Sequence, residues 1–423
     1  MKVALKGIIG ALNKIKILTS NDRTIPGIML DVSDNIMKVC YSDGRKAFIE
    51  EIEVETSDID VKGKVILDYA RFTSAITACQ PSGKLVVDNI DINITSDNKL
   101  VLVAEKKVPV GISEDGEVEY NVCSVFEQSL VWQPAGNDIK TSILTRVDYD
   151  SLFSSEVVDE YDIKMFKRMF TVLSSEKGRV VYISPKRKGS FVSNLAYLGY
   201  IDIDNDIQNP LSIKSDVAKQ VADIVDKFNG DKLYLHIQGN KYICIYSEDK
   251  KVGLMVEMSE PSQLHLNTLN RYQTSEYKKY QLTFITDALK NVVYNAMAID
   301  KVDKTVLKIK DNTLVIQSGN SNKNNYKVIC SECIDNVGDI DKLELQVSLN
   351  VLNDILSNCD GEYVAIDIDV DSDDGKLIRV GDISIEKRNE VLDGVEYSSL
   401  SVADKLGIRE KYLTKKLYTL SSK

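Results

Sequence analysis

Few residues of this 423-residue chain could do chemistry, and none of them stands near the partner residues that catalysis needs. The two histidines, His236 and His265, have no acid–cysteine or acid–serine arrangement nearby that would suggest a triad. Cys330 and Cys333 form a single CxxC without a second pair at zinc-finger spacing, so we expect a strand there. The acidic run from Asp367 to Asp374 lacks the glycine and glutamate of a calcium loop and predicts a strand that enters a hairpin turn. We therefore expect no enzyme, no metal site and no cofactor.

Composition favours an intracellular protein. Hydrophobic residues make up 43% of the chain, yet no apolar run approaches the ~18 residues of a membrane span. The N-terminus lacks the apolar segment of a signal peptide. The seven cysteines are scattered and odd in number, which favours a reducing compartment. We expect a cytoplasmic location and no membrane partner.

The elements that must position any functional side chains recur six times. Each of six segments with helical periodicity is followed by strand-like sequence, and the segments are Lys2–Leu18, Asp68–Cys79, Tyr161–Ser174, Lys214–Phe228, Phe284–Asn295 and Leu349–Asn358. They fall into three pairs, which predicts an α+β fold of three domains, each built from two helix-plus-β-meander repeats. We place these domains at residues 1–125, 140–260 and 278–388, with a helical C-terminal extension at 389–423 in which Ser401 caps a helix.

The net charge of −11 argues against a nucleic-acid partner unless the basic residues are segregated. The six helical windows contain 12 Lys or Arg against 7 Asp or Glu, so segregation runs in that direction. Apolar stripes leave Lys6 and Lys14 on the outer face of the first helix, and Lys164, Lys167 and Arg168 on that of the third. Arg71, Lys219 and Lys290 belong to the second, fourth and fifth helices. A solvated helix face is the alternative interpretation of all these residues.

Three stretches of the chain are similar in order and spacing to a known family. The first is Arg23-Thr24-Ile25-Pro26 leading into IMLDVSDNIMKVCYSDG, and the second is ILDYARFTSAITACQPSGKLVVDNIDINITSDNKLVL. The third runs from DALKNVVYNA through VSLNVLNDILSNCDGEYVAIDI. These stretches resemble the bacterial-type DNA polymerase sliding clamps, the beta subunits of DNA polymerase III. The resemblance covers about 110 residues at each end of the chain, and the middle of the chain fits mainly by pattern.

This resemblance implies a non-enzymatic processivity factor. Two chains would close a homodimeric ring around double-stranded DNA, with helices lining the hole and with sequence-independent phosphate contacts. A replicative polymerase and a clamp loader would bind through peptide motifs. Arg23 matches a DNA-contacting arginine of the family. We expect the ring to join through sheet edges at Lys99–Val110 and Tyr326–Ile334.

Two departures from the family pattern keep alternatives open. The middle domain lacks the Thr-x-Gly-His-Arg-like segment near the family's partner pocket, and the chain continues past Lys387 where the family has a short apolar C-terminus. These features look more like a bacteriophage clamp than a cellular one, acting in a phage-infected cell. The uneven basic lining also fits a monomeric processivity or transcription-accessory factor that binds one side of DNA without encircling it.

Overall fold

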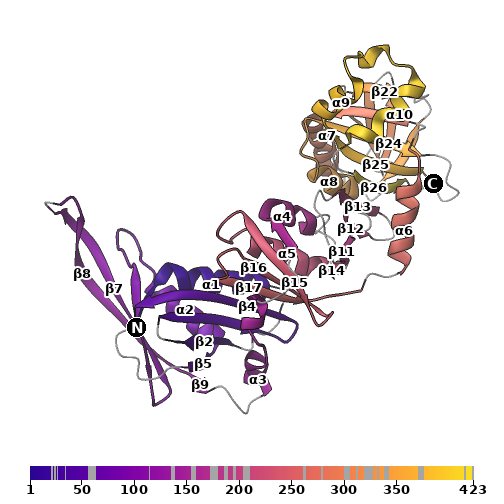
Figure 1. Ribbon diagram of the computed structural model, residues 1–423. Coiled ribbons are helices and arrows are strands. Elements are labelled where there is room, and N and C mark those ends of the chain that lie inside the picture. Colours follow the sequence, from indigo (N-terminus) through magenta and orange to yellow (C-terminus); the bar gives the residue numbers. More distant parts are fainter. Residues whose placement is uncertain are drawn as a thin grey trace. The chain divides into compact units, whose positions relative to one another are not determined.

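The computed structural model (Figure 1) describes residues 1–20, 22, 25, 27–33, 35–55, 63–113, 115–134, 139–153, 159–171, 180–184, 189–193, 197–202, 210–260, 263–277, 280–299, 305–310, 313–318, 327–330, 333–337, 343–369, 376–413 and 416–421. These residues divide into two compact units, Met1–Lys167 with Gln220–Met258, and Arg168–Lys219 with Ser259–Lys423. Helices and antiparallel strands alternate in both, so the predicted α+β class is confirmed. The two units do not coincide with the three predicted domains, whose limits stay predictions.

The first unit contains one sheet of 13 strands. Its strands are β1 (Lys2–Ala4), β2 (Ile28–Val32), β3 (Ile36–Ser42), β4 (Lys46–Glu55), β5 (Gly63–Leu67), β6 (Asn89–Thr95), β7 (Lys99–Ile112), β8 (Val118–Val131), β9 (Gln133–Pro134), β10 (Asp159–Asp162), β15 (Lys232–Gln238), β16 (Tyr242–Ser247) and β17 (Val252–Glu257). They lie in the order β10-β15-β16-β17-β4-β1-β6-β7-β8, and β3, β2, β5 and β9 branch from β4. The pairing of β17 with β4 joins the sheet of one predicted domain to that of the next.

The helices of this unit are α1 (Leu5–Leu18), α2 (Tyr69–Cys79), α3 (Ile139–Thr145) and the 3-10 turn η1 (Asp150–Phe153), while α4 (Ile163–Thr171) and α5 (Ser215–Val225) run across the division between units. Helix α1 buries Leu5, Ile8, Leu12 and Ile15 as its apolar stripe predicts, and it contacts α2. Asp68 caps α2 by accepting a hydrogen bond from the Arg71 backbone N–H. Stripe and cap together fix which face of each helix meets the sheet.

The second unit contains a nine-stranded and a four-stranded sheet. The strands are β11 (Val180–Ser184), β12 (Gly189–Ser193), β13 (Tyr197–Asp202), β14 (Leu211–Lys214), β18 (Tyr280–Ile285), β19 (Thr305–Lys310), β20 (Thr313–Ser318), β21 (Lys327–Cys330), β22 (Cys333–Val337), β23 (Glu344–Val347), β24 (Tyr363–Asp369), β25 (Lys376–Ile383) and β26 (Lys416–Ser421). The larger sheet has the order β14-β11-β12-β13-β26-β25-β24-β18-β22, and the smaller one β21-β20-β19-β23.

The helices of the second unit are α6 (Gln263–Thr274), α7 (Thr286–Ile299), α8 (Leu349–Ser357), α9 (Ile385–Leu392), the 3-10 turn η3 (Tyr397–Ser399) and α10 (Val402–Tyr412). Helix α7 contacts α8 as α1 contacts α2. All six predicted helices are present, with limits that differ by a few residues. Helix α6 lies between the second and third predicted domains and is not among the six predicted helical segments.

The sequence pattern predicts a helical C-terminal segment, but the segment also contains a strand. Helices α9 and α10 are present, and Ser401 caps α10 as predicted. Residues 416–421, however, form strand β26, which inserts between β13 and β25. Leu417 is fully buried and Tyr418 nearly so, because a strand with neighbours on both sides contributes to the core. The segment therefore completes the large sheet instead of lying outside it.

Buried charges attach α10 to this sheet. Asp367 of β24 accepts hydrogen bonds from Arg379 of β25 at 3.0 Å and from Arg409 of α10 at 3.1 Å. Arg409 also donates to the Thr283 hydroxyl at 2.9 Å and to the Leu282 carbonyl, and Arg379 pairs with Glu410. The strand predicted for the acidic run is confirmed up to Asp369, the last residue of β24, whereas the predicted turn falls on residues 370–375, which lie outside the described residues.

One predicted sheet edge is wrong. Strand β7 lies between β6 and β8, so the last strand of the 13-stranded sheet is β8. In the second unit β21 is the last strand of the smaller sheet, in agreement with the expectation for Tyr326–Ile334. Strand β8 is as long as β7 and pairs with it from Lys99 to Ile112.

Candidate nucleic-acid interface

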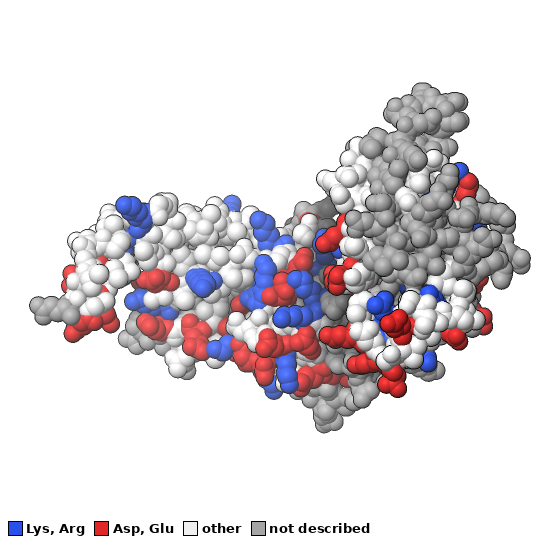
Figure 2. All heavy atoms as spheres, turned by 90° about the horizontal axis from the view of Figure 1, so that it is seen from above, with Lys and Arg blue, Asp and Glu red and all other residues white. Residues whose placement is uncertain are grey.

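Four of the predicted DNA-contacting residues present their side chains to solvent. Lys6 and Arg71 are exposed on the adjoining helices α1 and α2, Lys164 is exposed on α4, and Lys219 on α5. An exposed lysine or arginine on a helix face can reach a phosphate without reading a base. Figure 2 shows one face of the molecule, on which Lys and Arg side chains are interspersed with Asp and Glu.

Lys14 is not an outward-facing residue, contrary to the helix-periodicity prediction. Its side chain is buried against β4, where the ammonium group lies 2.7 Å from the Glu50 carboxylate. Burial raises the pKa of Glu50, and the charge and hydrogen bond of Lys14 oppose this rise. The pair therefore holds α1 on the sheet, and the Lys14 ammonium is occupied inside the protein.

Helix periodicity alone could not choose between Lys14 and Lys16. Each lies about 80° around the helix from Lys6, on opposite sides. The choice depends on β4, which places Glu50 beside Lys14 and leaves Lys16 exposed in the last turn of α1. Lys16 is thus a candidate phosphate contact that the sequence reasoning missed, and only the partner strand identifies it.

Two further predicted residues use their ammonium groups within the fold. Lys167 on α4 pairs with Asp226 at 2.8 Å, just after α5. Lys290 on α7 is half-buried and donates to the Cys359 carbonyl at 2.6 Å, beyond the end of α8. Lys167 is still more than a third exposed, so a phosphate could compete for it. Arg23 lies outside the described residues, and so does the side chain of Arg168.

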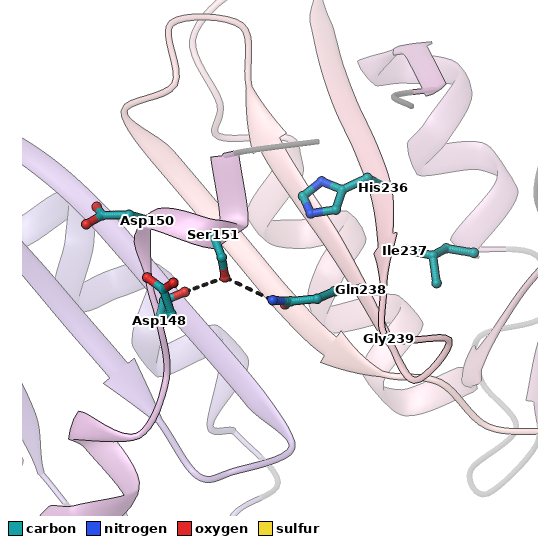
Figure 3. Close-up of a pocket in the computed structure, with 7 residues that line it drawn as sticks. All are labelled: Asp148, Asp150, Ser151, His236, Ile237, Gln238 and Gly239. Atoms are coloured by element: carbon teal, nitrogen blue, oxygen red, sulfur yellow. Dashed lines mark hydrogen bonds between the residues drawn. The ribbon is translucent and has the colours of Figure 1, made fainter. Parts of the chain in front are cut away.

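A cavity of about 530 Å³ in the first unit is the best candidate for chemistry (Figure 3). It is lined by Asp148, Asp150, Ser151, His236, Ile237, Gln238 and Gly239. The Ser151 hydroxyl donates to the Asp148 carbonyl at 2.7 Å and accepts from the Gln238 amide at 3.0 Å. Burial lowers the pKa of His236, and its hydrogen bond to the Ser151 backbone only partly offsets this. The Ser151 hydroxyl thus bonds to Asp148 and Gln238, which is not the serine–histidine arrangement that activates a nucleophile.

Other site types find no support among the described residues. Within them, no group of three or more His, Cys, Asp or Glu side chains could hold a metal ion. The two cysteines of the CxxC lie in different strands, Cys330 in β21 and Cys333 in β22. No helix in the described part of the chain is long and apolar enough to cross a membrane.

Comparison with solved structures shows which proteins have a similar fold. The DNA polymerase III beta chain of Streptococcus pneumoniae TIGR4 matches with a TM-score of 0.69 at 12% identity, over 100% of this chain and 99% of that one. The beta subunit of Thermotoga maritima gives 0.66 at 11% identity, and a DNA polymerase sliding clamp of Pseudomonas aeruginosa gives 0.67 at 11%, with the same coverage. No family model and no curated protein matches the sequence. The predicted resemblance to the beta clamps is confirmed at the level of the fold, over the full length of the chain.

Proposed function

We propose that this protein is a DNA sliding clamp, a processivity factor that encircles double-stranded DNA and tethers a replicative polymerase. The observation that carries the proposal is the full-length match in fold to DNA polymerase III beta chains, at TM-scores of 0.65 to 0.69. Exposed Lys6, Arg71, Lys164 and Lys219 on the predicted lining helices support it. Two copies would form the ring inside the cell, a separate ATP-driven loader would open it, and polymerase and loader would bind by peptide motifs. A phage origin stays a prediction.

A monomeric accessory factor that lies on one side of DNA is the second candidate. Lys14 and Lys290 are occupied inside the protein, so the lining supplies fewer free cations than the sequence predicted. A sparse basic surface suits weak one-sided binding as well as a ring. Light scattering across a concentration series separates the two, because the ring requires a mass of about twice 47.3 kDa. A mass that stays at one chain would exclude the ring and favour the accessory factor.

Salt titration tests the proposed DNA contacts. Duplexes of unrelated sequence should bind equally, with an affinity that falls steeply as salt rises. We expect Lys6→Ala, Arg71→Ala and Lys164→Ala each to reduce the slope of log K against log salt by about 0.9. Lys251→Ala is the matched control, because Lys251 is exposed, lies outside the helices and pairs with Glu53 of β4. Unchanged slopes in all three variants would show that these helices do not face DNA.

A further inference from the structure

The cavity beside His236 lies on the face of the sheet that α1 does not cover. Successive residues of a strand point to opposite faces of a sheet. On β4, Glu50 meets Lys14 of α1. Its neighbour Ile49 packs on the other face with Leu152 of η1. Because η1 supplies part of the cavity wall, the cavity lies on the same face as Ile49, and a ligand can enter it without displacing α1.

The two walls of the cavity are held together by packing and by a hydrogen bond. Tyr149 and Leu152 are buried in an apolar cluster with Cys244 of β16, which fixes the segment around η1 on the sheet. Between them, the Ser151 hydroxyl accepts a hydrogen bond from the Gln238 amide at 3.0 Å and so joins η1 to the end of β15. A site that is formed in advance loses less conformational freedom when a ligand binds.

The cavity wall carries uncompensated negative charge. Asp148 and Asp150 both line it. The Asp150 carboxylate binds the Lys38 ammonium group at 2.7 Å. Lys241, in the turn after β15, pairs with Glu257 at 3.1 Å. Among the described residues the Asp148 carboxylate has no ion-pair partner, so its charge is available to a ligand.

His236 adds a buried hydrogen-bond acceptor to the same cavity. The residue is 4% exposed, and Figure 3 shows its imidazole projecting from β15 toward η1. Burial lowers the pKa of His236, so the ring is neutral at pH 7 and has one donor and one acceptor nitrogen. Its bond to the Ser151 backbone opposes this shift, as donation to a carbonyl does, which leaves Nδ1 as the acceptor. Nδ1 has no hydrogen-bond partner within the described part of the chain, and a donor in the cavity would supply one.

These features favour a cationic ligand that donates several hydrogen bonds. Carboxylates and a neutral imidazole accept hydrogen bonds, and the two aspartates repel an anion. A guanidinium group fits this wall best, because its planar fork binds a carboxylate through two parallel bonds and has further N–H groups for another acceptor. The volume of about 530 Å³ also accommodates the aliphatic stem of an arginine. A metal ion suits it less, since no group of three or more His, Cys, Asp or Glu side chains among the described residues could hold one.

We propose that this cavity binds the guanidinium group of an arginine, with the Asp148 carboxylate and the His236 imidazole as its acceptors. Asp150 adds a weaker attraction, because Lys38 already neutralises part of its charge. No residue that lines the cavity belongs to the helices predicted to face DNA. Binding here therefore goes beyond the proposed clamp function and does not depend on ring formation. The arginine is either a free amino acid or a residue of another protein, and two probes distinguish these sources.

The test follows the imidazole signals of the two histidines by NMR while N-acetyl-arginine methylamide is added. The His236 signals should shift and reach saturation, and those of His265 in α6 serve as the reference. N-acetyl-citrulline methylamide has nearly the same shape without the charge and should bind about tenfold more weakly or less. Equal binding of the two compounds, or no shift of His236 with either, would exclude the guanidinium site. L-Arginine is the second probe: tighter binding than the blocked compound indicates the free amino acid, and equal or weaker binding indicates an arginine within a peptide.

A matched pair of variants separates this site from general attraction to an acidic protein. Asp148→Asn should raise the dissociation constant of the arginine compound about fivefold or more, because it removes the charge and keeps the size of the side chain. Asp91→Asn removes the same charge from the exposed face of β6 and should change the constant less than about twofold. Both positions are exposed, so thermal unfolding followed by circular dichroism should be unchanged in both variants. Equal weakening by the two variants would assign the binding to net charge and overturn the proposal, whatever the oligomeric state of the protein.

Discussion

Two segments of this chain meet their surroundings in opposite ways: the distal ribbon of residues 107–122 and the C-terminal segment that carries α10 and β26. The ribbon exposes an apolar face and pairs mainly within itself. The C-terminal segment inserts a strand between two others and buries the Arg409 guanidinium, which is 2% exposed. One segment is buried within the chain, and the other leaves large apolar side chains exposed.

The chemistry of the contacts explains this difference. A buried charge is tolerated only where partners surround it, and Arg409 has Asp367, Thr283 and the Leu282 carbonyl. Such a network fixes one position for α10 on the sheet. Exposed apolar side chains need no such network, and a contact that removes them from water is favourable. Buried ion pairs therefore hold the C-terminal segment in place, whereas the exposed valines of the ribbon take part in no such network.

The largest expected effect comes from breaking the buried ion pairs that hold the C-terminal segment. Asp367→Ala leaves the Arg379 and Arg409 guanidinium groups buried without their shared carboxylate, and should lower the free energy of unfolding by about 3–5 kcal/mol. Urea unfolding followed by circular dichroism measures this. Glu390→Ala, on the exposed side of α9, should cost less than about 0.5 kcal/mol. A loss below about 1 kcal/mol for Asp367→Ala would mean that the network does not hold the segment.

Amide hydrogen exchange should distinguish the two segments directly. Between protein concentrations well below and well above the dimer dissociation constant, exchange of the distal ribbon should slow by about tenfold or more, because association restricts opening. Exchange of α10 and β26 should not depend on concentration, since their partners lie in the same chain. If exchange in the two segments depends equally on protein concentration, association does not cover the ribbon selectively.

The smallest effect concerns pH. Burial raises the pKa of Glu410, but Arg379 and Lys416 lower it more, so the net shift is downward. A carboxylate with a lowered folded pKa stabilises the protein above its unfolded pKa of about 4.3, and this contribution is lost as pH falls through the folded value. Because the side chain is 54% exposed, Glu410→Gln should cost only about 0.5–1 kcal/mol at pH 7.

Urea unfolding of wild type and Glu410→Gln from pH 7 to pH 3 checks this expectation. The difference between the two proteins should shrink as the pH falls below about 4, where the wild-type carboxylate becomes protonated. Glu390→Gln is the control, because Glu390 is exposed on α9. A difference that stays constant over the whole range would assign the effect of Glu410 to packing instead of charge.

Local patterns were sufficient to predict the repeated elements. The apolar stripe of Leu5, Ile8, Leu12 and Ile15 defines α1, and Ser401 marks the start of α10, because both signals depend on neighbouring residues alone. Strand β26 was missed because KLYTLS is short, and its partners β13 and β25 lie far away in the sequence. Tertiary pairing decided its conformation.

The candidate site was less predictable for the same reason. Lys6 and Lys164 are exposed as predicted, since a residue opposite an apolar stripe faces solvent. Lys14 is buried because β4 supplies Glu50, and Lys290 is half-buried because a carbonyl after α8 accepts its proton. These acceptors lie 36 and 69 residues away along the chain. No helical pattern contains that information.

The position of β26 also sets the order in which the protein can be built on the ribosome. Strand β13 ends at Asp202, and its partner β26 begins at Lys416, so more than 200 residues must be synthesised before the two can pair. Until then the edge of β13 that pairs with β26 has no partner strand. The nascent second unit is therefore exposed to aggregation for most of its synthesis, and closure of its large sheet is among the last events of folding.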